Sequence, residues 1–582
     1  MLGRSLGARV RPQWRSWALC LWIGLFLIVT PASALQDDPA IAGRWSDVQS
    51  LPVVAAHAHL LPTGKVLMWY WNSGYFLWDP IKNRFKQVAE PEYNMFCAGH
   101  TSLADGRMFS AGGHEANEVG FPYASVFDPA TNTWARLPDM AAGRWYPTTT
   151  VLANGDVLAI SGLVYPDYTT GFNQLPEVWQ RSTQTWRPLT GALRSIRLYP
   201  WMFLAPNGNT FYAGPGYETT YLDTSGTGAW SPLTIPLAAD RDLGSAVMYA
   251  PGKILVIGGG DPPTASGEVI DLNSPAPSWR TIQPMSHVRR HANATLLADG
   301  SVFVVGGHNS TAFDDPTAGV FVPELWDPET ESWTQLAPHR IYRGYHTVAL
   351  LLPDGRVLVS GGGWVEKTAE IFSPPYLFRG PRPKISSVRK VVTYGEAFLV
   401  RTPDRASIEK VTWLRTGSVT HGFDESQSIN YLSFTRHRNG LTVTAPADPN
   451  VSPPGHYLLF LINSAGVPSL ASIIRIDAGT NTAGSVARPL DLVAREARGG
   501  GITLTWNDNS ANEDGFAIER SSDGANFVEV AALGADSTTF IDHEVVPGVL
   551  YSYQVKAYNR TAESTYSNLA TAILLSQPRR RK

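Results

Sequence analysis

The stretch YRGYHTVALLLPDGRVLVSGGG, residues 342–363, contains the core of a repeat that runs through most of this 582-residue chain. An apolar run leads into a Pro-Asp-Gly turn, and a second apolar run ends in consecutive glycines. In other copies a third run leads to a D-P-x-T-x-x-W closing segment. Short apolar runs separated by glycine turns are typical of antiparallel strands. The repeat therefore predicts small sheets made of consecutive hairpins.

The repeat occurs seven times, at the period of roughly 50 residues that kelch blades have. Its turn glycines are Gly64, Gly106, Gly155, Gly208, Gly252, Gly300 and Gly355. Its closing aromatic residues are Phe85, Trp134, Trp186, Trp230, Trp279 and Trp333. Turn, double glycine and tryptophan recur in one order. We therefore predict an all-β chain in which residues 35–380 form a seven-bladed kelch-type β-propeller.

The seventh copy lacks a closing tryptophan strand and runs instead into AEIFSPPYLF, residues 369–378. The segment GRWSDVQSLP around Trp45 has the pattern of the missing strand. We expect it to complete the seventh blade and lock the ring, which also covers an exposed sheet edge.

Two smaller units are expected after the Pro-rich boundary RGPRP, residues 379–383. Residues 384–477 alternate as strands do and predict a β-sandwich, and 478–488 read as a linker. In residues 489–576, Trp506 and Tyr551 fit the core tryptophan and tyrosine corner of a fibronectin type III domain. We expect that domain to act as a spacer or to contact a cell surface or polysaccharide. Residues 577–582 form a basic tail, interpreted as a solvated end.

The first 34 residues have the pattern of a secretory signal peptide. Four arginines precede the apolar run WALCLWIGLFLIV, and Ala32-Ser33-Ala34 is an A-x-A cleavage site. The prediction is a secreted, periplasmic or cell-surface protein cleaved near Ala34. A retained N-terminal anchor is the alternative. Because the signal carries four arginines and no acids, its removal changes the formal charge from −3 to about −7, which argues against a nucleic-acid partner.

Signal removal also takes Cys20 and leaves Cys97 as the one cysteine, so no intramolecular disulfide is expected. A lone cysteine in a secreted chain is a buried inert thiol, an intermolecular bridge or a reactive group. Composition alone favours the inert thiol.

The position of Cys97 in the repeat indicates chemistry. Cys97, Tyr146 and His346 each lie nine residues before a turn glycine, and Tyr345 adjoins the last. The same place in a repeat is the same place on one face, so these groups are expected to converge on a common axis. Tyr345 and His346 would point oppositely on a regular strand, so an irregular strand entrance is needed. Two phenolates with two imidazoles would suit Cu(II), and a second histidine is required.

The chain resembles the galactose oxidase and glyoxal oxidase family of copper radical oxidases over roughly residues 41–477. The segments that carry the resemblance are NMFCAGH, GRWYPTTTVLANGDV, YRGYHTVALLLPDGRVLVSGGG, VTHGFDESQ and PPGHYLLFLINSAGVPSLASIIRI. GRWYPT and THGFDESQ are similar to the bacterial, glyoxal-oxidase-like branch.

The resemblance implies a role for each residue of the site. Cys97 would form a thioether to the ring of Tyr146, which would be a copper ligand and hold the stored radical. Tyr345 would be the axial ligand and the base, and His346 and His421 would supply the imidazoles. The implied reaction oxidises a primary alcohol, an aldehyde or a glycan terminal group with O2 and yields H2O2. No soluble cofactor is implied, and we expect a monomer.

The resemblance also has departures. The family's tryptophan over the cross-link falls at or near Val164, and Trp71 is the alternative for that place. The substrate arginine of galactose oxidase falls near Ser195, so galactose specificity is not implied. Candidate pocket residues are Trp71, Tyr199, His291 and Phe313, and the last three are equally consistent with channel packing. Five histidines beside glycine turns are interpreted as structural: His57, His59, His100, His114 and His308.

The repeat by itself is also consistent with function classes other than catalysis. Kelch propellers often only bind proteins or sugars. The alternative prediction is a non-catalytic extracellular propeller that binds carbohydrate or protein, and a structural propeller in an envelope complex is a third.

Overall fold

The computed structural model describes residues 38–575 except 233, 478–485, 487, 498, 509, 511–512, 560–562 and 565. The predicted signal peptide, the basic tail and most of the predicted linker lie outside the described residues. The described part is all-β, with one short α-helix, α2 (Pro39–Ala42), and two 3-10 helices, η1 (Pro316–Ala318) and η2 (Pro375–Phe378). None of the helices in this described part reaches the length and hydropathy that a membrane-spanning helix requires.

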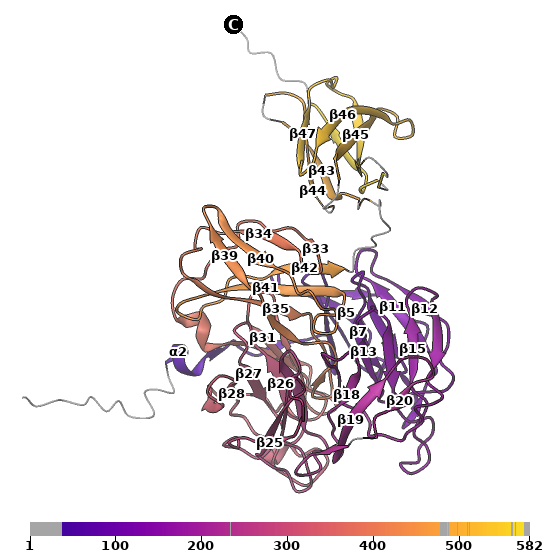
Figure 1. The fold of residues 1–582 in the computed structure, drawn as a ribbon, viewed down its shortest axis with the longest axis vertical. Coiled ribbons are helices and arrows are strands. Elements are labelled where there is room, and N and C mark those ends of the chain that lie inside the picture. The colour runs from indigo at the N-terminus through magenta and orange to yellow at the C-terminus, as the bar shows by residue number, and fades with distance from the viewer. Residues whose placement is uncertain are drawn as a thin grey trace, which may run out of the picture.

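Seven antiparallel sheets follow one another along the chain from residue 57 to 373, and we number them 1 to 7 (Figure 1). Sheet 1 contains β3 (His57–Leu60), β4 (Val66–Trp69), β5 (Tyr75–Asp79) and β6 (Arg84–Val88). Sheet 2 contains β7 (Gly99–Ser102), β8 (Met108–Ala111), β11 (Ala124–Asp128) and β12 (Thr133–Leu137). Sheet 3 contains β13 (Thr148–Val151), β14 (Val157–Ile160), β15 (Glu177–Gln180) and β16 (Thr185–Pro188). A small hairpin, β9 (His114–Ala116) and β10 (Val119–Gly120), projects from sheet 2.

Sheets 4 to 6 repeat the same order of strands. Sheet 4 contains β17 (Met202–Leu204), β18 (Thr210–Tyr212), β19 (Glu218–Asp223), β20 (Ala229–Trp230) and β21 (Ile235–Pro236). Sheet 5 contains β22 (Ser245–Ala250), β23 (Lys253–Ile257), β24 (Gly267–Asp271) and β25 (Arg280–Thr281). Sheet 6 contains β26 (Asn293–Leu296), β27 (Val302–Val305), β28 (Glu324–Asp327) and β29 (Ser332–Gln335). In each sheet the first strand is buried along most of its length and the last is largely exposed, so each sheet has an inner and an outer edge.

Sheet 7 is completed by the N-terminal segment. It combines β30 (Val348–Leu351), β31 (Val357–Ser360) and β32 (Thr368–Ser373) with β1 (Arg44–Trp45) and β2 (Gln49–Ser50). Trp45 lies opposite Phe372 on β32, and its indole N–H donates to the Ala337 carbonyl at 2.7 Å. The N-terminal segment therefore supplies the closing strand that the seventh copy of the repeat lacks.

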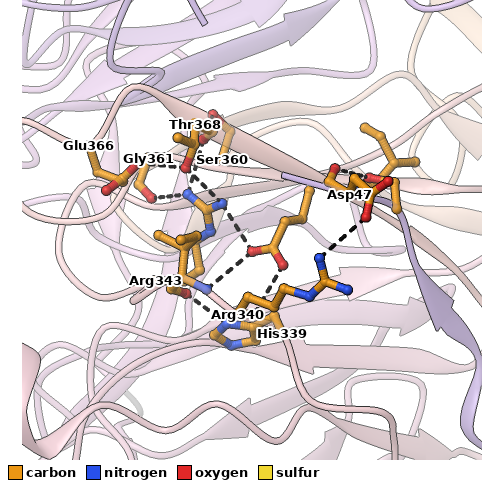
Figure 2. A network of polar contacts seen from close by, with 12 residues as sticks. Asp47, His339, Arg340, Arg343, Ser360, Gly361, Glu366 and Thr368 are labelled. Atoms are coloured by element: carbon orange, nitrogen blue, oxygen red, sulfur yellow. Dashed lines mark hydrogen bonds and ion pairs between the residues drawn. The ribbon is translucent and has the colours of Figure 1, made fainter. Parts of the chain in front are cut away.

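Each of four sheets contains its own buried arginine–glutamate ion pair. The arginine lies just before the first strand and the glutamate on the third strand of the same sheet, and all eight side chains are at most 2% exposed; the pairs are Arg144–Glu177, Arg241–Glu268, Arg289–Glu324 and Arg343–Glu370. Figure 2 shows that Arg343 also donates to Gly361 and Thr368. The same network reaches the N-terminal segment, because Arg340 pairs with Asp47 at 3.3 Å.

Removing one partner of such a pair is expected to destabilise the seven-sheet region. Glu324→Ala leaves Arg289 charged and buried without its carboxylate, which costs about 3–5 kcal/mol. Thermal unfolding should show a lowered midpoint. The control is Glu329→Ala, because Glu329 pairs with Lys410 at the surface and exposed pairs contribute about 0–1 kcal/mol. Equal midpoints for the two variants would contradict the prediction.

Residues 385–477 form a second unit with two sheets. The larger contains β33 (Val391–Thr393), β42 (Ser472–Asp477), β41 (Gly455–Asn463), β35 (Ile408–Arg415) and β38 (Ile429–Tyr431), and the smaller contains β34 (Ala397–Arg401), β40 (Gly440–Thr444) and β39 (Phe434–His437). Buried Trp413 and Tyr457 stack in the core of this unit with ring centroids 4.9 Å apart.

One hairpin leaves this second unit and joins sheet 1. It consists of β36 (Ser418–Thr420) and β37 (Phe423–Asp424), and β36 pairs with β3. The hairpin also contacts the first strands of sheets 2, 5, 6 and 7. The second unit therefore reaches the inner edges of five sheets, with His421 at the hairpin tip.

The third unit also has two sheets and follows the predicted linker (Figure 1). Its strands are β43 (Leu490–Glu496), β44 (Ile502–Asn507) and β47 (Thr539–Asp542) in one sheet, and β46 (Val528–Gly534), β45 (Gly515–Ser521), β48 (Leu550–Tyr558) and β49 (Ala570–Ile573) in the other. Trp506 and Tyr551 are both in its core, and the Tyr551 hydroxyl accepts from the Val546 N–H at 3.1 Å.

Candidate active site

Six of the seven strand entrances share an unusual backbone conformation. The residues nine before the turn glycines have φ between 42° and 65° in sheets 2 to 7; they are Cys97, Tyr146, Tyr199, Leu243, His291 and His346. Left-handed backbone is uncommon for residues other than glycine and gathers at functional sites. At these entrances successive side chains do not alternate as they do on a strand. The irregular entrance that Tyr345 and His346 required is therefore present, and it is a property of the repeat.

Backbone hydrogen bonds link these residues from sheet to sheet. The Tyr146 N–H donates to the Cys97 carbonyl at 3.0 Å, and the Tyr199 N–H donates to the Tyr146 carbonyl at 2.9 Å. The Cys97 thiol is fully buried and is hydrogen-bonded to the Tyr146 side chain. The Cys97 N–H donates to Nε2 of His57 at 3.1 Å. Cys97 and Tyr146 are thus held side by side.

The predicted ligand residues come together around the hairpin tip. The hydroxyls of Tyr146 and Tyr345 hydrogen-bond to each other. The ring centroid of His421 lies 4.5 Å from that of Tyr146, 4.8 Å from that of His346 and 5.5 Å from that of Tyr345. Two phenols from sheets 3 and 7, an imidazole from sheet 7 and an imidazole from the second unit therefore meet in one place.

His421 is presented by a tight turn. Thr420 and Phe423 pair across it, while His421 has φ 49° and Gly422 has φ 83°. Two successive residues with positive φ are what a two-residue type I′ hairpin requires. A Cβ at position 422 would lie 2.8 Å from the Ala292 carbonyl oxygen, so glycine is needed there for space as well as for conformation.

Both imidazoles have the hydrogen-bonding pattern of metal ligands. Nδ1 of His346 lies 3.2 Å from the Gly363 carbonyl, which can only accept. Nδ1 of His421 lies 2.6 Å from the Thr420 hydroxyl, which donates to the Ala56 carbonyl at 3.0 Å. Both Nδ1 atoms therefore carry the proton. Nε2 of each ring is buried without a hydrogen-bond partner among the described residues, so each has a lone pair available for a metal.

Burial sets the protonation of the site. It lowers the pKa of His346 to about 3 and holds the pKa of His421 well below its usual value. It raises the pKa of Tyr146, Tyr345 and Cys97 well above their usual values. The imidazoles are therefore neutral near pH 7, and the phenols keep their protons unless a cation replaces them. Neutral imidazole and phenolate are ligands that suit Cu(II).

The tryptophan over Tyr146 is Trp145, the residue before it in the chain. The two rings stack with centroids 3.7 Å apart and planes within 10°. Val164 and Trp71, the two positions that the sequence suggested, do not provide this stacking. Trp71 instead lies over Phe96, with centroids 6.3 Å apart, and contacts His114. Sequence reasoning missed Trp145 because neighbours on a regular strand point apart.

Two cavities open beside the phenols, with volumes of about 650 and 790 Å³. They share the lining residues Trp145, Tyr146, Tyr168, Phe313 and Tyr345. Tyr199 and His291 line the first cavity and Trp71 the second, so all four candidate pocket residues border the site. The sequence did not indicate Tyr168 or Trp364, which also line the cavities and are more than half exposed.

The cavity walls carry more acids than bases. Arg194 and Arg197 line the first cavity, but Arg194 pairs with Glu218 at 2.7 Å and Arg197 with Asp240 at 2.5 Å. Three further carboxylates complete the charged lining of the two cavities, and they belong to Glu115, Glu118 and Asp242.

The five histidines interpreted as structural lie around the ligands. His59 bonds to Ser418 at 2.9 Å and to Ser102 at 3.0 Å, and His100 bonds to Ser418 at 2.6 Å. His57 accepts from the Cys97 N–H. Two of the five are closer to the cavities: His114 accepts from the Trp145 indole at 3.3 Å, and His308 bonds to the Phe313 carbonyl at 3.2 Å.

Comparison with known proteins agrees with this arrangement. The chain is 32% identical to galactose oxidase of Gibberella zeae over 505 residues, which covers 77% of this chain and 72% of the relative. The chain belongs to the galactose oxidase and glyoxal oxidase family. The family model "Galactose oxidase-like, Early set domain" matches residues 382–476, which is the second unit, and a Kelch motif model matches residues 289–340 in sheet 6 and its flanking segments.

Other members of the family share less identity. Aldehyde oxidase GLOX of Vitis pseudoreticulata is 28% identical, and the match covers 66% of this chain and 82% of the relative. A fungal alcohol oxidase of the AA5 family, solved in complex with copper, superimposes with a TM-score of 0.69 at 27% identity. That match covers 75% of this chain and 99% of the solved structure.

Proposed function

We propose that this chain is a copper radical oxidase that converts a primary alcohol or aldehyde group with O2 and releases H2O2. The observation that carries the proposal is the donor set. Two partnerless Nε2 atoms and two phenols meet at one buried point of the described structure, with the Cys97 thiol against Tyr146. Galactose oxidase, aldehyde oxidase and copper alcohol oxidase relatives support the same assignment.

Tyr146, Tyr345, His346 and His421 would hold the copper. When bound, copper would accept one of the two electrons that the substrate gives up and pass electrons on to dioxygen, and the thioether-linked Tyr146 would accept the other electron. Tyr345 lines both cavities and takes the proton of the substrate hydroxyl. Trp145 stacks on the Tyr146 ring and covers one of its faces. An alcohol R–CH2OH and O2 thus give R–CHO and H2O2, with no soluble cofactor.

The cavity walls favour a neutral or cationic substrate. Five carboxylates and two arginines line the two cavities, and salt bridges occupy both arginines. Four exposed aromatic residues border the openings and offer flat apolar faces: Trp71, Tyr168, Phe313 and Trp364. Small primary alcohols, aldehyde hydrates and neutral or amino sugar ends of glycans fit this chemistry, whereas uronic acids would meet like charge.

The remaining parts of the proposal concern architecture and location. We infer that the seven sheets are the blades of one propeller, supported by seven turn repeats and by the β1–β32 closure. The third unit is proposed to be a fibronectin type III domain, supported by the Tyr551 hydroxyl bond and buried Trp506. Secretion after a signal peptide, a monomeric state and the bacterial branch rest on the sequence alone.

A peroxide assay on copper-loaded protein tests the proposed function. The substrate panel contains simple primary alcohols, glyoxal, glycolaldehyde, neutral sugars, amino sugars and uronic acids. Peroxide formed with equimolar loss of O2 is expected from at least one neutral member. If copper binds and no substrate gives peroxide, the chain is better described as a non-catalytic propeller that binds carbohydrate or protein.

Loss of the Thr420 hydroxyl is expected to weaken copper binding without removing a ligand. Thr420→Val takes away the acceptor that fixes the tautomer of His421, and such changes typically cost about 10–100-fold in metal affinity. Competition with a copper chelator measures the loss. Thr420→Ser keeps the hydroxyl and should retain affinity, so equal weakening by both substitutions would contradict this role.

Copper affinity is expected to rise with pH because the phenols release protons. The pKa of His346 is lowered to about 3, so above about pH 4 no proton competes for that imidazole. The pKa of Tyr146 and of Tyr345 is raised, so each phenol that becomes a ligand must release one proton. Each released proton makes copper affinity rise about tenfold per pH unit. Calorimetry in buffers of different ionisation enthalpy counts these protons, and a count of zero would contradict phenolate ligation.

A further inference from the structure

A cluster of three carboxylates lies in the third unit, outside the copper site. Asp508 and Glu513 are in the connection between β44 and β45, and Asp536 is in the connection between β46 and β47. One oxygen from each carboxylate lies within 4.8 Å of the other two. The grouping therefore joins two loops that are separate in the sequence.

Glu513 is the member that points to a ligand. It is only 8% exposed, and its Oε2 is buried without a hydrogen-bond partner among the described residues. Its other oxygen accepts from the Asp536 N–H at 3.2 Å, which ties the two loops together. A buried carboxylate oxygen without a partner is unfavourable unless a cation or a proton compensates it.

Two cationic side chains of this unit, Arg520 and Lys556, are paired with other carboxylates. Arg520 pairs with Asp542, and Lys556 pairs with Glu563 and Glu519. The pKa of Asp508 is raised to about 6, mainly by burial and in part by the charge of Glu513, although the Ser510 N–H and Arg389 act in the opposite direction. Among the described residues, no lysine or arginine forms an ion pair with Asp508, Glu513 or Asp536.

We propose that Asp508, Glu513 and Asp536 form a Ca²⁺ site that joins the two loops of the third unit. Ca²⁺ takes six to eight oxygen ligands, as carboxylates with one or both oxygens and as water. Three carboxylates from two separate loops suit that flexible coordination. Mg²⁺ requires a regular octahedron and usually keeps several waters on one or two carboxylates. The expected affinity is that of extracellular calcium modules, a Kd of roughly 10⁻⁴–10⁻³ M.

Terbium luminescence on the full-length, copper-loaded protein tests the site. Trp506 is buried two residues before Asp508, so excitation of tryptophan should sensitise Tb³⁺ bound at the cluster. We expect saturable emission that Ca²⁺ displaces and that Mg²⁺ displaces at least tenfold less well. Calcium should also raise the unfolding midpoint of the third unit, which gives a second readout that does not depend on terbium.

Glu513→Gln is the decisive variant, because it removes the buried charge with little change in shape. It should weaken Ca²⁺ binding at least tenfold, while Glu529→Gln, an exposed acid on β46, should leave it unchanged. Absence of saturable emission in the parent protein, or equal binding by Glu513→Gln and parent, would overturn the proposal in favour of a shared proton. Peroxide formation is measured in parallel, so failure of this site and failure of the oxidase assignment can be distinguished.

Discussion

Replacing Cys97 with serine is expected to reduce peroxide formation by on the order of 10³-fold or more, equivalent to about 4 kcal/mol of transition-state stabilisation. The reason is that serine cannot form the thioether that makes the Tyr146 ring easier to oxidise. The thiol is hydrogen-bonded to the Tyr146 side chain, and a backbone hydrogen bond of 3.0 Å also links the two residues. The ring is therefore already in place for the cross-link.

Mass spectrometry separates this explanation from general damage to the fold. After metal-free protein is loaded with copper in air, the Cys97 and Tyr146 peptides should be joined, with a mass lower than their sum by two hydrogens. Cys97→Ser should give two separate peptides while retaining copper, since all four proposed ligands remain. Tyr93→Phe is the control, because Tyr93 is a buried tyrosine that lines neither cavity, and it should keep both cross-link and activity. Separate peptides with a free thiol in active parent protein would contradict the radical cofactor.

The repeat makes much of this site predictable from the sequence. Equivalent positions of a repeat occupy equivalent positions in the fold. The shared position nine residues before the turn glycine is therefore enough to group Cys97, Tyr146 and His346. The same logic includes Tyr199 and His291, which line the first cavity. Closure by Trp45 is predictable because the seventh copy visibly lacks one strand.

The stacked rings are not predictable in this way, for a physical reason. Strand alternation separates neighbouring side chains, so Trp145 is not expected over Tyr146. A left-handed residue at the strand entrance folds the two rings together instead. The effect occurs twice, because Trp145 and Tyr146 have ring centroids 3.7 Å apart and so do Tyr345 and His346. A left-handed entrance, once recognised, predicts both pairs.

His421 could be assigned only through the resemblance to a known family, because it lies outside the repeat. Its sequence nevertheless contains a local signal. A His-Gly pair between Val419-Thr420 and Phe423, residue types that favour strands, fits a two-residue hairpin, and positive φ at both residues of the pair agrees with that geometry. What local sequence could not give is the partner of that hairpin, since Thr420 of β36 lies opposite His57, a residue far earlier in the chain.

Replacing His421 with alanine is therefore expected to lower copper affinity by more than the roughly 100-fold that loss of a supporting hydrogen bond costs. Nε2 of His421 is buried with a free lone pair and has no partner within the described structure. The exposed His437 on β39 is the matched control, and His437→Ala should bind copper as the parent does.

The fold is expected to survive this substitution, which makes the result interpretable. The hairpin is held by strand pairing between β36 and β3 and by the bonds of Ser418 to His59 and His100, none of which uses the His421 ring. Unfolding midpoints of the metal-free proteins should thus agree, while copper content and the electron paramagnetic resonance spectrum change. If His421→Ala binds copper as tightly as the parent, the ligands come from the seven sheets alone. The second unit would then shape the site without completing it.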